Sequence, residues 1–406
     1  MAGLIPFAPP RIDQKIIDSV TETLKSGWIT TGPRTKKFEK DIATYCGSKA
    51  VLCLNSATAG LELVLHWFGV SEGDEVIIPA YTYAATANVV VHCGAKPVMI
   101  DIGFDFNINW KKISGAINEK TKVIIPVDFG GLPCDYNEIN NLVNQKEIIS
   151  LFKPKNEIQE KLGRILILSD AAHSIGAEIN GKKTGVLTDI TVFSFHAVKN
   201  LTTAEGGAIS LNLPKPFDNT GVYKELCIKS LHGQNKDALA KMEKGNWKYD
   251  IVEAGYKSNM TDIMAAIGMV ELERYDDETL PKRKKIFNNY LSAFSNYEWA
   301  ELPCQGDANK KSCWHLFPLR IKKVSEEIRD RIIADVFEQN VSVNVHFIPL
   351  PMLSFYRNRG YKITDYPVSY DNYSREISLP VFFDLSESDQ QNVINAVINS
   401  VNRFIK

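Results

Sequence analysis

Apolar residues form short, nearly continuous runs that alternate with segments of helical periodicity through the first two-thirds of the chain. The runs are Ala50–Leu54, Glu75–Pro79, Lys96–Asp101 and Lys122–Val127. Between them, Thr58–Trp67 and Thr86–Cys93 carry apolar residues at helical spacing. Strands that are apolar throughout and separated by helices predict an α/β fold, with a mostly parallel sheet covered by helices on both faces.

The pattern changes near residue 280. The segment Asp262–Asn296 is long, mostly helical and charged, and Pro281 within it predicts a kink or a break. Further along, strands are predicted at Leu316–Ile321, Ser342–Phe347 and Ile377–Pro380, and helices at Ser325–Asn340 and Ser386–Phe404. We therefore predict a large domain over residues 1–275, which includes an N-terminal arm, and a smaller α+β domain over residues 276–406.

The composition argues against several classes of protein. The 406 residues carry a formal net charge of −1, unlike a basic nucleic-acid-binding protein. No apolar run approaches the roughly 20 residues that cross a bilayer, and the N-terminus does not resemble a secretory signal. Seven scattered cysteines without a Cys-x-x-Cys pair argue against a disulfide framework or a zinc site. We expect a cytoplasmic protein that uses no metal ion and binds neither nucleic acid nor membrane.

Two charged residues follow apolar runs and suggest a specific chemistry. Asp170 follows Ile165–Leu168 with Ser169 between them, and Lys199 lies in the segment Ser194–Leu201, which precedes Ala204–Gly207. Pyridoxal phosphate (PLP) needs such a pair, because a lysine amine forms a Schiff base with its aldehyde and a carboxylate keeps its pyridine nitrogen protonated. Taken singly, the lysine could equally be a solvated loop charge and the aspartate a helix cap or turn residue.

Two further segments lie where a strand gives way to a helix, the position at which open α/β sheets bind ligands. Asn55–Gly60 consists of small and polar residues, so its backbone amides and hydroxyl groups could hold a phosphate. Tyr83 follows the run Glu75–Pro79 and could stack on a planar ring. The alternatives are an ordinary helix cap at Ser56 or Thr58 and routine packing of the tyrosine.

In this order, these segments resemble those of the DegT/StrS-type sugar aminotransferases, which are PLP enzymes of fold type I. The resemblance covers nearly the whole chain and is carried by residues 27–33, 73–79, 169–173, 194–201, 255–262, 314–317 and 378–380. It implies a large domain with a mostly parallel seven-stranded sheet between helices, and a smaller C-terminal α+β domain. Within the family, Lys257 and Ala204–Gly207 are most similar to the enzyme that makes UDP-4-amino-4-deoxy-L-arabinose.

The resemblance implies PLP as the cofactor and assigns roles around it. Lys199 would carry the Schiff base and move the proton, Asp170 would pair with the pyridine nitrogen, and Tyr83 would stack on the ring. His173 would lie near the ring oxygen or the phosphate. The phosphate would be held by Ala57, Thr58 and Ser194, and by Lys257 from the neighbouring subunit of a homodimer.

The resemblance assigns fewer roles to substrate-binding residues than to cofactor-binding residues. Trp28, Ile29, Thr30 and His346 are candidate substrate-binding residues. Relatives often carry glycine where Ala57 stands and a second histidine where Pro351 stands, and the polar segment Gln145–Gly163 reads as a surface insertion. These departures leave open which sugar is bound.

The function implied is the transfer of an amino group from an amino acid, with L-glutamate expected, to a nucleotide-linked 3- or 4-keto-deoxy sugar. The product would be an amino sugar for a surface polysaccharide or a glycosylated product. One alternative is a sugar 3-dehydratase on the same fold, in which histidine replaces the Schiff-base lysine. Others are a PLP-fold lyase, which would need a mobile cysteine such as Cys304 or Cys313, and a homologue that binds or regulates without catalysis.

Overall fold

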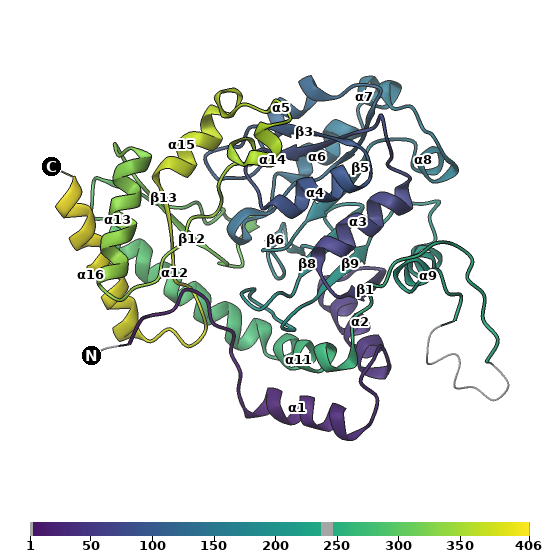
Figure 1. Ribbon diagram of the computed structural model, residues 1–406, viewed down its shortest axis with the longest axis horizontal. Helices are drawn as coiled ribbons and strands as arrows, with labels where there is room; N and C mark the ends of the chain where they lie inside the picture. The colour runs from purple at the N-terminus through teal and green to yellow at the C-terminus, as the bar shows by residue number, and fades with distance from the viewer. Residues whose placement is uncertain (1–2, 237–246, 406) are drawn as a thin grey trace.

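The computed structural model describes residues 3–236 and 247–405, and a seven-stranded sheet lies at its centre (Figure 1). The strand order is β1-β9-β8-β5-β4-β2-β3, and only β9 runs antiparallel to its neighbours. The predicted mostly parallel sheet is therefore confirmed. The strands are β1 (Ala50–Leu54), β2 (Glu75–Pro79), β3 (Lys96–Ile100), β4 (Thr121–Ile124), β5 (Leu166–Asp170), β8 (Ile190–Ser194) and β9 (Gly207–Leu211).

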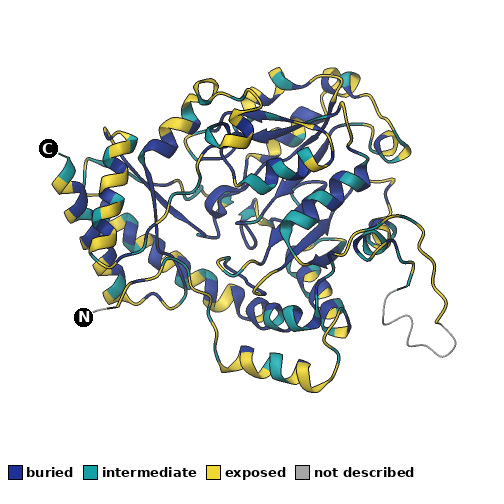
Figure 2. Ribbon diagram, viewed as in Figure 1, coloured by how far each residue is buried: buried dark blue, intermediate teal, exposed yellow. Residues whose placement is uncertain are grey.

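Helices cover both faces of this sheet. In β1, Leu52 and Leu54 pack into the core cluster that contains α3 (Ala57–Phe68), while Val51 and Cys53 pack into the cluster of α2 (Pro33–Cys46) and α11 (Asp262–Glu273). Because successive strand residues point to opposite faces, these two clusters lie on opposite sides of the sheet. This burial on both sides explains why the strands are apolar throughout and appear buried in Figure 2.

The remaining elements of the first 275 residues surround this core. The helices are α1 (Gln14–Lys25), α4 (Ala84–His92), α5 (Trp110–Ile113), α6 (Tyr136–Val143), α7 (Lys146–Leu151), α8 (Glu157–Leu162) and α9 (Asn219–Ser230), with the short turns η1 (Ser114–Ala116) and η2 (Phe129–Gly131). The strands β6 (Glu178–Ile179) and β7 (Lys182–Lys183) join β11 (Lys310–Lys311) in a small antiparallel sheet. The predicted surface insertion Gln145–Gly163 contains α7 and α8.

The C-terminal part forms an antiparallel sheet of β10 (Ala300–Glu301), β12 (Phe317–Ile321) and β13 (Glu376–Leu379) with its own core. It is seen beside the large sheet in Figure 1, together with the ends of the chain. Its helices and turns are α12 (Leu280–Phe294), α13 (Glu326–Glu338), η4 (Leu350–Met352), α14 (Ser354–Arg357), η5 (Ile363–Asp365), α15 (Pro367–Arg375) and α16 (Glu387–Phe404).

Two predictions for this region need adjustment. The long helix breaks before Pro281, at the π turn η3 (Tyr275–Thr279), and the proline then occupies the first turn of α12, where its missing N–H costs nothing. The strand predicted at Ser342–Phe347 is wrong. The segment makes one isolated bridge, Asn344 to Ser378, and the N–H of His346 bonds to the Glu376 side chain rather than to a strand.

Chain segments cross between the two parts. Ile5 in the N-terminal arm pairs with Val341 and belongs to the core of the C-terminal part, whereas Leu350 and Tyr356 pack into the core beneath the large sheet. The division at residue 275 stays a prediction, and the arm and residues 350–356 each pack against the part to which their neighbours in sequence do not belong.

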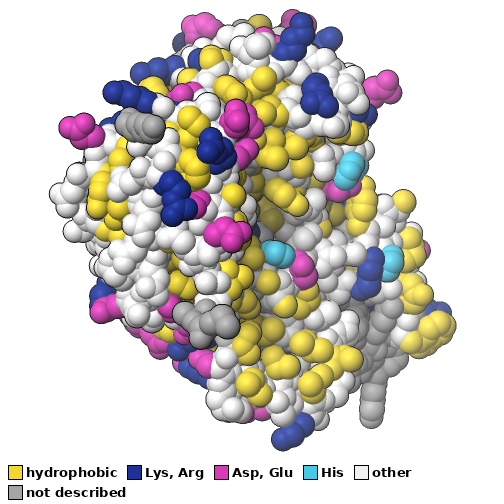
Figure 3. Space-filling model, turned by 60° about the vertical axis from the view of Figure 1, so that its left-hand side comes forward, with side chains coloured by type: hydrophobic (Ala, Val, Ile, Leu, Met, Phe, Trp, Pro, Cys, Tyr) yellow, Lys and Arg dark blue, Asp and Glu magenta, His cyan; other side chains and the backbone are white. Residues whose placement is uncertain are grey.

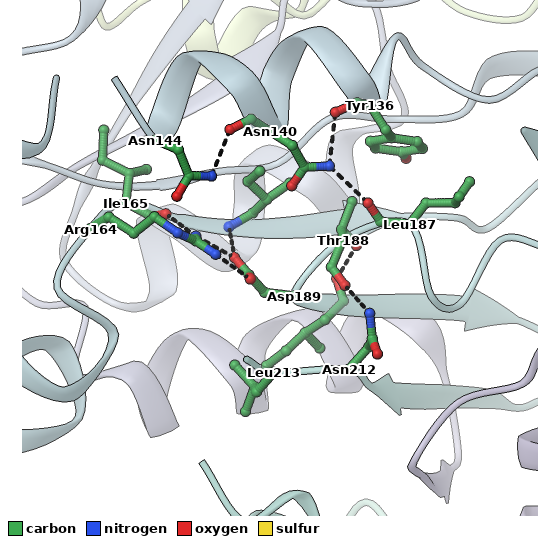
Figure 4. Close-up of polar contacts among 12 residues, drawn as sticks. Tyr136, Asn140, Asn144, Arg164, Ile165, Leu187, Thr188, Asp189, Asn212 and Leu213 are labelled. Atoms are coloured by element: carbon green, nitrogen blue, oxygen red, sulfur yellow. Dashed lines mark hydrogen bonds and ion pairs between the residues drawn. The ribbon is translucent and has the colours of Figure 1, made fainter. Parts of the chain in front are cut away.

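A polar network fixes the ends of β5 and β8 that face away from the functional site (Figure 4). Arg164 donates to both carboxylate oxygens of Asp189 at 2.7 Å, and the backbone N–H of Ile167 donates to the same carboxylate at 3.0 Å. Asp189 is 5% exposed. This network holds the register of the two strands, whose opposite ends carry Asp170 and Ser194.

Replacing Arg164 with alanine is expected to lower the free energy of unfolding by about 3 kcal/mol, because the buried carboxylate of Asp189 loses its counter-ion. Urea denaturation of the variant measures this change. Lys37→Ala is the control, since it breaks a solvent-exposed pair with Asp41 and should change stability little. Equal stability of both variants would show that the Arg164 pair does not hold the strands together.

Candidate functional site

A cavity of about 350 Å³ lies beyond the C-terminal ends of β5 and β8, within the size range of small-molecule sites. Figure 3 shows a face of the molecule that is hollowed near its centre, with hydrophobic side chains around the hollow. The predicted residues that line the cavity are Ala57, Thr58, Tyr83, Asp170, His173, Ser194, Lys199 and His346. Residues far apart in the sequence thus meet in one place.

Lys199 is half-buried at the cavity wall, in the loop that follows β8. Its backbone N–H donates to His196 O at 2.9 Å, and the N–H of Thr203 closes the loop onto Phe195 O. Burial lowers the pKa of the Lys199 amine to about 8, and the nearby charge of Asp170 partly opposes this shift. The amine is therefore partly neutral near neutral pH, as a nucleophile or a base must be.

Asp170 ends β5 with its carboxyl group buried at the cavity wall. It accepts hydrogen bonds from Thr86 Oγ1 at 2.8 Å and from the Ala172 N–H at 3.2 Å. Burial raises the pKa of Asp170, whereas these two hydrogen bonds and the charge of Lys199 oppose the rise. The carboxylate is thus oriented and desolvated, and a positively charged partner in the cavity would be strongly favoured.

The loop between β1 and α3 has the form of a phosphate site. Ser56 caps α3 by accepting from the Ala59 N–H at 3.1 Å, while Ala57 and Thr58 begin the helix. The first N–H groups of a helix lack helical acceptors and attract anions. Ala57 does not have a positive φ, so its methyl group causes no backbone strain. A Cβ on Gly207 would lie 2.4 Å from the Ala57 nitrogen, so the glycine lets this loop approach β9.

Histidine and aromatic rings form another wall. His173 is buried, and its Nδ1 accepts from the Gly130 N–H at 3.3 Å, which leaves the ring proton on Nε2. The ring of His315 lies 4.3 Å from that of His173 and is held by Asn200 Oδ1, 2.8 Å from His315 Nδ1. Burial lowers the pKa of both histidines well below the usual value, so both rings are neutral. Phe347 stacks on His173 at 5.9 Å.

Tyr83 lies on the more open side of the cavity, whereas His346 is partly buried. Tyr83 is the residue before the first turn of α4, and it is 66% exposed. The centre of its ring lies 5.9 Å from the centre of the Phe347 ring. His346 is stacked against Phe7 of the N-terminal arm at 5.4 Å. The arm and the C-terminal segment therefore close the cavity together.

Four predicted site residues lie outside this chain's cavity. Lys257 lies on the outer side of the loop Asn55–Thr58, in a separate hollow that shares Ser56 and Thr58 with the cavity. Its amine donates to Asn259 Oδ1, and Asn259 Nδ2 donates to Thr31 Oγ1 at 2.6 Å. Residues 28–30 precede that threonine, so Trp28, Ile29, Thr30 and Lys257 form one neighbourhood on the surface.

Sequence reasoning missed three residues that shape the site. Thr86 orients Asp170, and His315 and Phe347 line the cavity. Thr86 lies three residues after Tyr83, and His315 falls inside a matched segment, but no spacing rule connects either one to Asp170 or His173. The insertion Gln145–Gly163 lines no part of the cavity.

The cavity fits the chemical requirements of PLP. It places a partly neutral lysine amine, a buried oriented carboxylate and the N-terminus of a helix with hydroxyl groups around a single space. His173 is neutral with its proton on Nε2, so it can donate a hydrogen bond to an anionic oxygen without adding charge.

The described residues contain no group of three or more His, Cys, Asp or Glu side chains placed to hold a metal ion. All seven cysteines are free thiols. Among the same residues, no helix combines the length and apolar character that would let it span a membrane.

Comparison with known proteins connects this site to a family. The model of the DegT/DnrJ/EryC1/StrS aminotransferase family matches residues 10–153 and 155–398. The chain is 42% identical over 400 residues to "Uncharacterized protein MJ1066" of Methanocaldococcus jannaschii, covering 97% of each chain. It is 35% identical over 398 residues to the spore coat polysaccharide biosynthesis protein SpsC of Bacillus subtilis, covering 97% of this chain and 96% of SpsC.

A solved structure is similar to this chain over nearly the full length of both proteins. The PLP form of "Putative sugar aminotransferase Spr1654" from Streptococcus pneumoniae has a TM-score of 0.94 and 41% identity, and covers 99% of this chain and all of its own. A second form of that protein contains pyridoxamine phosphate (PMP) and has the same TM-score.

Proposed function

Since the chain belongs to the DegT/DnrJ/EryC1/StrS aminotransferase family and is a PLP-dependent aminotransferase, we propose that it transfers an amino group from L-glutamate to a 3- or 4-keto-deoxy sugar carried on a nucleotide. The product would enter the synthesis of a surface polysaccharide. The names of SpsC and of the Streptococcus pneumoniae structure support a sugar as the acceptor.

The meeting of Lys199, Asp170 and the loop Ser56–Thr58 in one cavity is the observation that carries this proposal. PLP, when bound there, supplies an electron-accepting ring and a carbon that carries nitrogen between the two substrates. The Lys199 amine, with a pKa of about 8, would accept the proton that leaves the amino acid Cα and deliver it to the cofactor carbon bonded to the same nitrogen.

The residues around Lys199 would hold the reacting groups in place. Asp170 would keep the pyridine nitrogen protonated, and Thr86 would fix the carboxylate by its 2.8 Å hydrogen bond. Ala57, Thr58 and Ser194 would bind the phosphate, and His173 would donate from Nε2 to an oxygen of the cofactor. Because both substrates must reach the same lysine, they would bind in turn rather than together.

The features required by the alternative functions are missing from the cavity. A sugar 3-dehydratase would have histidine at the Schiff-base position, where this chain has Lys199. The lyase reading needs a cysteine that can reach the cavity, but Cys313 is buried with its thiol on His173 O, and Cys304 does not line the cavity.

A homodimer with shared sites accounts for the residues left outside the cavity. Lys257 is exposed and lies close to residues 28–30, and the apolar side chains of Ile29, Tyr256 and Ile251 nearby are also exposed. If this surface faces the cavity of a second copy, Lys257 would supply a positive charge to the phosphate bound there. Exposed apolar side chains would be buried by the same contact.

Replacing Lys257 with alanine is expected to weaken PLP binding by about 10- to 100-fold, because one hydrogen bond to a charged group is lost. Equilibrium titration of the apoenzyme with PLP measures the affinity. Lys248→Ala is the matched control, because it removes an exposed lysine from the same region of the chain.

A mixed dimer identifies the subunit on which Lys257 acts. In a heterodimer of Lys199→Ala and Lys257→Ala chains, one complete site remains only if Lys257 serves the partner's cavity. Each homodimer of a single variant lacks any complete site. The assay uses a PLP concentration that loads the wild type but not the Lys257→Ala homodimer. Under that condition, activity in the heterodimer would support the shared site, and its absence would place Lys257 in its own subunit.

The donor and the acceptor are tested in separate half-reactions. Adding L-glutamate to the PLP enzyme should convert its visible absorption to that of PMP and release 2-oxoglutarate. The PMP enzyme is then mixed with UDP- or dTDP-linked 3-keto and 4-keto deoxy sugars, and return of the PLP absorption identifies the acceptor. Conversion by another amino acid alone would overturn L-glutamate, and no return with any nucleotide sugar would overturn the proposed acceptor.

A further inference from the structure

A chain of hydrogen bonds runs from the buried side chain of Glu376 to the ring of His346 at the cavity. The two atoms Glu376 Oε1 and Ser378 Oγ lie 2.5 Å apart, and Ser378 Oγ lies 2.9 Å from His346 Nδ1. The backbone N–H of His346 donates to Glu376 Oε2 at 3.1 Å. Glu376 and Ser378 are alternate residues of β13, so their side chains point to the same face of that strand.

The His346 ring is held in one orientation. Phe7 stacks against it at 5.4 Å, and Ser378 contacts Nδ1. Among the described residues, no hydrogen bond engages Nε2, which is left to serve a ligand in the cavity that His346 lines. Burial and the charge of Lys199 lower the pKa of His346 to about 3, so the ring is neutral and carries a single proton.

Glu376 is fully buried and has no counter-ion within the described part of the chain. The cations near it have other carboxylate partners, since Arg320 pairs with Glu301 and Arg329 with Asp330, and Arg329 reaches only the backbone carbonyl of Glu376. Among the described residues, Tyr81 and His346 are the other titratable groups near Glu376. Burial raises the pKa of Glu376 to about 8, against the opposing effects of Ser378, the His346 N–H and the two arginines.

The relay can hold its protons in two ways. With Glu376 ionised, Ser378 donates to Oε1, His346 Nδ1–H donates to Ser378, and Nε2 faces the cavity as an acceptor. With Glu376 protonated, Oε1–H donates to Ser378, Ser378 donates to Nδ1, and Nε2–H becomes a donor. Each hydrogen bond is kept in both states, and only its direction is reversed.

We infer that Glu376, acting through Ser378, decides whether His346 offers a hydrogen-bond donor or an acceptor to the sugar in the cavity. This inference rests on the proposed function for the identity of the ligand. Glu376 is then a positioning residue, since it touches neither substrate nor cofactor. The donor form suits a carbonyl oxygen, which can only accept, so the keto sugar should bind better while Glu376 is protonated.

The proton position can be measured without any substrate. In the PLP enzyme labelled with ¹⁵N-histidine, the two ring nitrogens of His346 report which one carries the proton, and His346→Gln assigns its signals. We expect Nε2–H at pH 6.5 and Nδ1–H at pH 9.5. A His346 that keeps one tautomer over this range, or that becomes doubly protonated, would overturn the inference.

Two variants separate the relay from general effects on the fold. In Glu376→Gln the amide can donate to Ser378 permanently, so His346 should stay in the Nε2–H form at every pH. In Ser378→Ala the hydrogen-bonded link between Glu376 and His346 is removed, so the tautomer of His346 should no longer follow the protonation of Glu376. This variant tests the relay independently if Glu376→Gln does not fold. Glu326→Gln is the control, because Glu326 bonds to Tyr373 and is outside the relay. A tautomer change with pH that survives in Ser378→Ala would also refute the relay.

Kinetics test the consequence for binding. In the wild type, KM for the keto sugar should rise about tenfold between pH 7 and pH 9.5, the effect of one hydrogen bond. Glu376→Gln should remove this rise. If no keto sugar is accepted, the proposed function fails but the tautomer result still decides the relay. If the sugar is accepted and KM shows the same pH dependence in both proteins, the inference is wrong.

Discussion

Lys199→Ala is expected to lower the rate of transamination by on the order of 10⁴-fold or more, because under the proposed function the variant loses both the amine that would bond PLP and the group that would move the proton. The glutamate half-reaction, followed by the visible absorption of the cofactor, measures this loss. PLP should still bind, since the phosphate loop and Asp170 do not depend on the amine.

Lys199→Arg is the matched control for charge. It keeps a cation at the same place but cannot bond the cofactor, so it should be as inactive as the alanine variant. Borohydride reduction of the wild type, followed by peptide mapping, should leave the cofactor attached to Lys199. Attachment to another lysine, or substantial activity in Lys199→Ala, would contradict the assignment.

Asp170→Asn is expected to slow the glutamate half-reaction by on the order of 10³-fold, because an amide cannot keep the pyridine nitrogen protonated. The asparagine side chain has the same shape as the aspartate side chain, and its amide oxygen can still accept the hydrogen bond from Thr86. Stopped-flow absorption of the half-reaction gives the rate, and the free energy of unfolding shows whether the fold is intact.

Two variants calibrate this effect. Thr86→Val removes the 2.8 Å hydrogen bond to Asp170 and should cost about tenfold, since the carboxylate itself remains. Asp128→Asn alters another buried carboxyl group, which bonds to Ser174 and Tyr136 and does not line the cavity. If Asp128→Asn slowed the half-reaction as much as Asp170→Asn, the loss would reflect a general disturbance of the sheet.

Much of the candidate site could be predicted because its residues lie at strand ends and at a helix start, which the local sequence indicates. Lys199 and Asp170 each follow an apolar strand, and the ends of neighbouring parallel strands meet at one edge of a sheet. The segment Asn55–Gly60 was recognisable because a helix N-terminus needs small and polar residues. These signals depend only on residues close together in the sequence.

Other parts of the site depend on contacts between distant segments. Thr86 meets Asp170 across 84 residues, and Ser378 meets His346 across 32 residues. The predicted strand at Ser342–Phe347 failed for the same reason, since the backbone of His346 bonds to a side chain of β13 instead of a ladder. Local periodicity contains no information about such pairings.

The sequence by itself determined the mostly parallel sheet and the family, and it predicted the pair Lys199 and Asp170, because burial on both faces of a sheet and the requirements of the cofactor select residue types directly. Only the tertiary structure decided that β9 runs antiparallel, that Trp28 and Lys257 lie outside the cavity of their own chain, and that Glu376 reaches His346. These features arise from packing between segments far apart in the chain, where many arrangements satisfy the same local pattern and the contacts of the whole fold select one of them.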